Sequence, residues 1–134
     1  MKEDDNKMGR VSYENGKNFE DKIQLWYRSK HYWAYKIPTQ LSGTIFDIIV
    51  AKGGSCLFIE CKHVNGDKLR YNCGLEKKTI ELNHFVETTN NNVYIYIYSE
   101  KLNGIYWTTW KKAYTIFKQK GYLDIAKDCY KANM

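Results

Sequence analysis

The sequence predicts an α/β (α+β) domain in which helices flank a central mixed β-sheet of about five strands. Apolar side chains recur at helical spacing between Phe19 and Tyr27, which is typical of a helix packed on a sheet. Two apolar runs flank Gly53-Gly54, which indicates a β-hairpin. The run VYIYIYS alternates as strands do. The expected order of elements is α-β-β-β-α-β-β-α.

Each element follows from local signals. The apolar stripe predicts a first helix, and Pro38 ends the aromatic strand that follows it. Thr109 is a suitable N-cap for the last helix, and Gly121 suits the position after its end. The stretch 63–74 has no periodicity and is expected to be a surface loop. The predicted helices are about 15–29, 75–88 and 110–120, and the predicted strands are about 31–37, 45–51, 56–62, 93–99 and 105–109.

Size and charge limit the possible functions. A chain of 134 residues forms one domain, expected at 13–134 after a flexible polar segment at 1–12. Its 43% hydrophobic content excludes a disordered chain, and its net charge of +6 suits an anionic partner such as nucleic acid. No run approaches the roughly 20 apolar residues that span a bilayer. The expected location is therefore the cytoplasm, or the host cytoplasm if a phage encodes the chain.

The hairpin places two acidic residues on one face. With Gly53-Gly54 as its loop, Asp47 lies directly opposite Glu60, and the strand period of two puts Lys62 on the same face. Facing carboxylates repel each other unless a positive charge lies between them. A divalent cation, with Lys62 completing the site, is the obvious candidate. The pattern points to a metal-dependent phosphodiesterase.

A zinc site is the alternative that the cysteines raise. Four His and Cys side chains can be combined on paper, but no regular finger or ribbon spacing supports them. Reduced, partly buried thiols are the favoured interpretation. The residues of that alternative are Cys61, His63, Cys73 and His84.

These motifs resemble the PD-(D/E)XK nuclease superfamily, and within it Holliday junction resolvases of the archaeal Hjc and bacterial or phage RecU types. The matching segments are GKNFE, YKIPTQLSGT, FDIIVAKGG and LFIECKH, in that order. Phe46 stands where the superfamily's eponymous proline would be, and the chain is shorter than typical RecU proteins. The resemblance implies a restriction-endonuclease-like core with its site on the central hairpin.

The resemblance also implies roles for these residues. Asp47 and Glu60 would bind the metal with the backbone carbonyl of Cys61, and Glu20 would hold a second metal or a metal-bound water. Lys62 would orient the attacking water or stabilise the transition state, or act simply as a counter-ion to Glu60. Oxygen ligands favour Mg2+, for which Mn2+ can substitute. The expected catalytic set is thus Glu20, Asp47, Glu60 and Lys62.

DNA is the expected partner, without a membrane or a small-molecule cofactor. Polar side chains near the site are candidates for phosphate contacts, and a basic cluster after the catalytic strand would grip the backbone. These DNA-binding candidates are Lys36, Gln40, Ser42, Thr44, Lys68, Arg70, Lys77 and Lys78.

The leading hypothesis is a Mg2+-dependent endonuclease that cleaves four-way DNA junctions by hydrolysis, during recombination, repair or phage DNA processing. The resemblance implies 5′-phosphate ends, and paired nicks in a two-fold substrate imply a C2 homodimer. Two alternatives stay open: another small structure-specific or restriction-like nuclease, and a non-catalytic nucleic-acid-binding module on the same fold.

Overall fold

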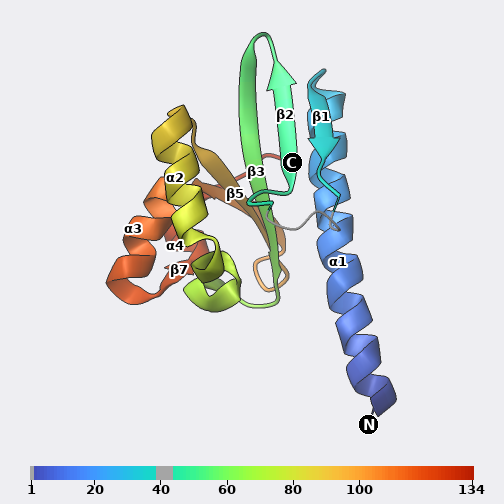
Figure 1. Cartoon of the computed structure of the whole chain (residues 1–134). Coiled ribbons are helices and arrows are strands. Elements are labelled where there is room, and N and C mark those ends of the chain that lie inside the picture. Colours follow the sequence, from blue (N-terminus) through green and yellow to red (C-terminus); the bar gives the residue numbers. More distant parts are fainter. Residues whose placement is uncertain (1, 39–43) are drawn as a thin grey trace.

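A mixed sheet with the strand order β1-β2-β3-β5-β6-β8 forms the centre of the protein (Figure 1). The computed structural model describes residues 2–38 and 44–134, with side chains from residue 16 onward. Within that part of the chain the α-helices are α1 (Lys2–Ser29), α2 (Thr79–Thr89), α3 (Trp110–Lys120) and α4 (Ile125–Asp128), and short 3-10 helices span Tyr71–Cys73 and Leu75–Lys77. The strands are β1 (Trp33–Lys36), β2 (Ile48–Lys52), β3 (Ser55–Val64), β4 (Lys68–Arg70), β5 (Val93–Ser99), β6 (Gly104–Thr109), β7 (Tyr122–Asp124) and β8 (Tyr130–Lys131).

The β2–β3 hairpin has the predicted turn and register. Gly53 and Gly54 both have positive φ, 57° and 84°, as the two-residue primed turn requires. Ile48 lies opposite Ile59 in the antiparallel pair. On its other side β3 runs parallel to β5, so the hairpin is joined to the second half of the sheet through its longer strand.

Each face of the sheet carries its own hydrophobic core. Figure 1 shows α1 along one face, with α2 and α3 on the other. Because successive strand residues point to opposite faces, Ile59 packs with the α1 core, and Phe58 packs against the α2 and α3 core. The α1 core contains Phe19, Ile23, Tyr27, Ala34, Ile48, Val50, Ile59, Tyr96 and Ile105. Glu60 is also buried, and by the strand alternation it points to the same face of the sheet as Phe58, where an apolar residue would be usual.

The helices agree with the sequence prediction in kind, with different bounds. Thr109 caps α3 by accepting a hydrogen bond from the Lys112 amide, and Gly121 follows the helix in the left-handed conformation. Helix α1 begins at Lys2, well before Asn15. Because the side chains of residues 1–15 lie outside the description, the flexibility expected of residues 1–12 stays a prediction, as does the domain boundary at residue 13.

The stretch 63–74 is not the surface loop that the sequence predicted. β3 continues to Val64, and β4 pairs antiparallel with β7 in a separate two-stranded sheet. Leu69, in the middle of β4, is buried in the core. A three-residue strand is too short to show a period, and its partner lies far along the chain. β8 and α4 were missed for the same reason, so the described main sheet has six strands.

Candidate active site

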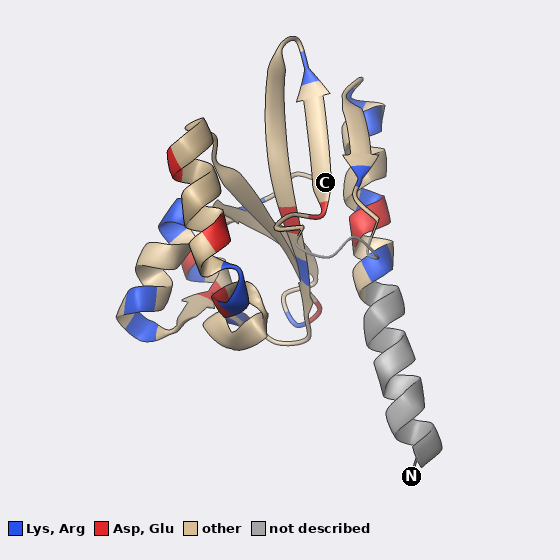
Figure 2. Ribbon diagram, viewed as in Figure 1, with Lys and Arg blue, Asp and Glu red and all other residues tan. Residues whose placement is uncertain are grey.

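Asp47 and Glu60 are neighbours where the β2–β3 pairing begins, because the charge of Asp47 acts on Glu60. The amide of Asp47 donates to the carbonyl of Ile59 at 2.8 Å, but Ile59 is already the partner of Ile48, so the regular register ends at Ile48 and Asp47 lies just before β2 rather than inside the predicted strand 45–51. Oδ2 of Asp47 accepts a hydrogen bond of 2.8 Å from the amide of Cys61. This bond fixes the carboxylate over β3, beside Glu60. Figure 2 shows acidic segments at the start of β2, on β3 and on α1 at the same level of the molecule.

Glu20 brings a third carboxylate to this place from α1. Burial is the main cause that raises the pKa of Glu20 to about 7, and repulsion from the neighbouring Asp47 carboxylate is the second. Lys36 of β1 lies between the helix and the sheet, with its Nζ 3.6 Å from Glu20 and 2.6 Å from Asp21. The upstream glutamate and the hairpin acids therefore form one electrostatic cluster.

Glu60 is buried and has two cationic neighbours. Glu60 as a whole residue is only 2% exposed. Burial, followed by repulsion from Asp47, raises the pKa of Glu60 to about 7, although both lysines lower it. Nζ of Lys62 lies 3.6 Å from Oε1 of Glu60, and Nζ of Lys78 lies 3.1 Å from the same oxygen. Lys62 also donates to the carbonyl of Cys73 at 3.4 Å.

The oxygen donors suit a hard divalent cation. Mg2+ typically uses one or two protein carboxylates and keeps several waters, so Asp47 and Glu60 can supply enough ligands. Over residues 16–38 and 44–134, whose side chains the structure describes, no three His, Cys, Asp or Glu side chains already converge on a single metal position. Burial also raises the pKa of the Cys61 thiol well above its usual value, which disfavours the thiolate that zinc requires.

The predicted DNA-binding residues are distributed over several places. Lys36 lies beside Glu20, and Lys78 contacts Glu60. Lys68 and Arg70 lie on β4, where the ammonium of Lys68 is 4.9 Å from the ring centroid of Tyr122. Lys77 is exposed before α2, and Thr44 is partly buried ahead of Asp47. Gln40 and Ser42 lie outside the described residues.

Sequence reasoning missed the position of Lys78. It was grouped with Lys77 because both belong to a run of basic residues before a helix. In the structure Lys77 is exposed, but Lys78 reaches both carboxylate oxygens of Glu60, at 3.1 and 3.3 Å. Adjacent residues at a helix start point in different directions, so the run of charge could not reveal which lysine turns inward.

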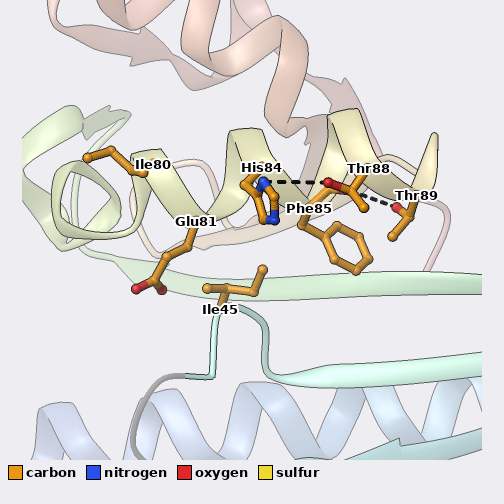
Figure 3. A pocket seen from close by; sticks show the side chains of 7 residues that line it. All are labelled: Ile45, Ile80, Glu81, His84, Phe85, Thr88 and Thr89. Carbon is orange, nitrogen blue, oxygen red and sulfur yellow. Dashed lines mark hydrogen bonds between the residues drawn. The ribbon is translucent and has the colours of Figure 1, made fainter.

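A second feature lies between α2 and Ile45, two residues before Asp47. A hollow of about 430 Å³ is lined mainly by apolar and uncharged polar side chains (Figure 3). Ile80 stands at one end of the hollow and is 85% exposed. Exposed apolar surface of this kind often marks an interaction site. The lining residues are Ile45, Ile80, Glu81, His84, Phe85, Thr88 and Thr89.

Comparison with known proteins identifies the fold. The chain is similar to the solved structure of Hjc, a Holliday junction resolvase of the archaeal hyperthermophile Archaeoglobus fulgidus, with a TM-score of 0.56. The match covers 73% of this chain and 75% of that chain, at 16% sequence identity. No family model matches the sequence, and no curated protein matches it. The predicted fold class and the resemblance to this type of nuclease are therefore confirmed at the level of the fold. Among the described residues, no helix is long and apolar enough to cross a membrane.

Proposed function

We propose that the protein is a Mg2+-dependent endodeoxyribonuclease that resolves four-way DNA junctions. The observation that carries this proposal is the pair of neighbouring carboxylates, Asp47 and Glu60, with Lys62 3.6 Å from Glu60, on a fold similar to that of Hjc. Placing the partly buried Asp47 beside the buried Glu60 costs stability, and such costs are common at functional sites. The pair therefore favours a functional role over a structural one.

The proposed catalytic roles are distributed over four side chains. Asp47 and Glu60 would hold Mg2+ (or Mn2+) with the backbone carbonyl of Cys61, and Glu20 would accept hydrogen bonds from a water at the site. The ion would lower the pKa of a water and neutralise charge on the scissile phosphate. Lys62, anchored by Cys73 and Glu60, would hold its ammonium toward the phosphate or the attacking water.

DNA binding is inferred from charge and position. The net charge of +6 favours a polyanion, and Figure 2 shows basic segments on both sides of the acidic cluster. Lys68, Arg70 and Lys77 follow the catalytic strand on one side of it, and Lys36 lies on the other. We expect these side chains to contact phosphates. The residues between Lys36 and Asp47, with Gln40, Ser42 and Thr44 among them, would contribute further polar contacts.

A homodimer is part of the same proposal. A four-way junction has two-fold pseudo-symmetry, so paired nicks require two active sites related by a two-fold axis. A C2 interface must be self-complementary, and the apolar hollow beside Ile80 offers a surface that a second copy of α2 can cover. None of the three carboxylates lines this surface, although Ile45 at its edge is two residues from Asp47.

The decisive experiment compares DNA substrates of one sequence. Purified protein is incubated with a synthetic four-way junction, a linear duplex and a single strand, each with Mg2+ or with EDTA. Mg2+-dependent paired cuts in the junction alone support the proposal. Equal cutting of the linear duplex favours a restriction-like nuclease instead. Tight junction binding without cleavage, at every salt concentration and pH, leaves the non-catalytic binding module.

A further inference from the structure

Lys78 makes the closest contacts to the buried carboxylate. Its Nζ lies 3.1 Å from Oε1 and 3.3 Å from Oε2 of Glu60, so the ammonium bridges both oxygens. Lys62 approaches Oε1 alone, at 3.6 Å, and is shared with the carbonyl of Cys73. Of these two lysines, Lys78 is therefore the principal counter-ion of Glu60.

The two lysines also differ in how they are held. Lys62 belongs to β3, and its backbone is paired with Ile97 of β5. Lys78 belongs to the turn before α2, and its side chain is 29% exposed. A lysine side chain is long and flexible, so an ammonium with access to solvent can leave its partner without moving the backbone. The Lys62 side chain is less exposed, at 18%, and its ammonium has a second partner in the Cys73 carbonyl, so Lys78 is the more readily released of the two.

A divalent cation and Lys78 compete for the same oxygens. A buried carboxylate needs a positive partner, and in this structure Lys78 provides it. A cation ligated by Glu60 and Asp47 would supply that charge itself and would repel an ammonium beside it. A bound cation would therefore neutralise the charge of Glu60 that attracts Lys78, and would occupy the space of the Lys78 ammonium.

We propose that Lys78 is an exchangeable counter-ion of Glu60, which holds the carboxylate in place until a divalent cation displaces it toward a DNA phosphate. The inference rests on the proposed nuclease function and adds a positioning residue to it. Lys78 acts through Glu60 while the site is free of metal. After displacement it lies at the edge of the same site, where a backbone phosphate is the available anion.

Calorimetric titration of Mn2+ into DNA-free protein tests the exchange. Lys78→Met removes the competing ammonium, so Mn2+ should bind about tenfold more tightly than to the wild type. Lys78→Arg keeps the charge and can grip both oxygens through two N–H groups, so Mn2+ should bind more weakly. Lys101→Met is the matched control: it removes an exposed lysine that forms an ion pair with Asp67 at 3.3 Å, and it should leave the affinity unchanged.

The two variants keep the inference falsifiable if one of them does not fold. If Lys78→Met unfolds because Glu60 loses its main partner, the weaker Mn2+ binding of Lys78→Arg decides the question. Unchanged or weaker binding by folded Lys78→Met, or unchanged or tighter binding by Lys78→Arg, overturns the exchange. If the wild type binds Mn2+ and cleaves junctions but the variants give either of these contrary results, only the exchange of Lys78 is refuted. If the wild type binds no Mn2+, the proposed nuclease function is refuted too.

Discussion

The amide of Cys61 donates a 2.8 Å hydrogen bond to Oδ2 of Asp47, and so ties the carboxylate ahead of β2 to the strand that carries Glu60. The bond takes the place of a strand pairing at the point where the β2 ladder ends. It fixes the direction of the Asp47 side chain before any ligand arrives. An active site that is organised in advance loses less free energy when it binds its ion and substrate.

Replacing Asp47 separates this structural role from the chemical one. Asp47→Asn keeps an oxygen that can accept from Cys61 but removes the charge, so junction cleavage should fall by about a thousandfold or more. Thermal stability at pH 8 should not fall, because the repulsion of Glu20 and Glu60 is relieved. Asp47→Ala also removes the acceptor and should cost a further 1–3 kcal/mol or so of unfolding free energy. Cleavage assays and thermal melts measure the two effects.

The matched control for this pair is Asp67→Asn. Asp67 is a surface acid that forms an ion pair with Lys101, so its replacement should leave cleavage at the wild-type rate. Full activity of Asp47→Asn would refute the assignment of Asp47 as a metal ligand. Equal stability of the Asn and Ala variants would show that the Cys61 bond contributes nothing to the fold.

The raised pKa values of Glu20 and Glu60 predict an unusual dependence of stability on pH. Both rise from a usual 4.5 to about 7 because of burial and then of repulsion from Asp47. Between these values the folded, metal-free protein holds protons that the unfolded chain has released, so its unfolding free energy should fall as the pH rises from about 4.5 to about 7. Thermal melts in EDTA across this range measure the slope.

Added Mg2+ should reverse that slope. The cation competes with protons for the same carboxylates, so it should raise the melting temperature at pH 8 and have little effect at pH 5. Asp47→Asn should lose the Mg2+ effect at pH 8. An equal rise at both pH values would mean that the ion binds elsewhere.

The hairpin glycines test what sets the register of β2 against β3. Gly54 has φ of 84°, and a Cβ there would meet no atom within 4 Å, so Gly54→Ala adds only backbone strain. We expect a loss of about 1–2 kcal/mol of unfolding free energy. Gly16→Ala is the control: Gly16 lies inside α1, has open space around it and should gain up to about 1 kcal/mol. Chemical denaturation measures both, and a neutral Gly54→Ala would argue against the primed turn.

The sequence predicted most of what depends on short-range signals. The two glycines set the hairpin register from the Ile48–Ile59 pair to the Lys52–Ser55 pair. The cap at Thr109 and the turn residue Gly121 set the ends of α3. Each of these features is decided by residues close together in the chain, where backbone geometry leaves few choices.

Long-range contacts could not be predicted in the same way. β4 forms only because β7, about fifty residues later, pairs with it and buries Leu69. Lys78 turns toward Glu60 because the fold brings the start of α2 against β3, a contact between residues 18 positions apart. Neither segment has a hydrophobic period or a motif of its own. Only the packed structure shows that β4 is a strand rather than a loop, and that Lys78 is a partner of Glu60 rather than a surface charge.

The exposed position of Ile80 predicts how the protein assembles. If the hollow beside α2 is the two-fold interface, Ile80→Glu should convert the dimer to a monomer, because two buried charges would face each other across the axis. Light scattering after size-exclusion chromatography measures the mass. Because Ile80 is 85% exposed in the single chain, the variant should keep its fold, with a change in stability within about 0.5 kcal/mol for the monomer.

Leu25→Glu provides the matched control for assembly. Leu25 is also a large apolar side chain, 63% exposed, but it lies on α1, away from the hollow. This variant should remain a dimer and should still make paired cuts in a junction. The Ile80→Glu monomer should bind junctions more weakly and release singly nicked products, since one site cannot cut both strands in a single encounter. A wild-type protein that is monomeric at high concentration, or a Leu25→Glu variant that dissociates equally, would contradict an interface on α2.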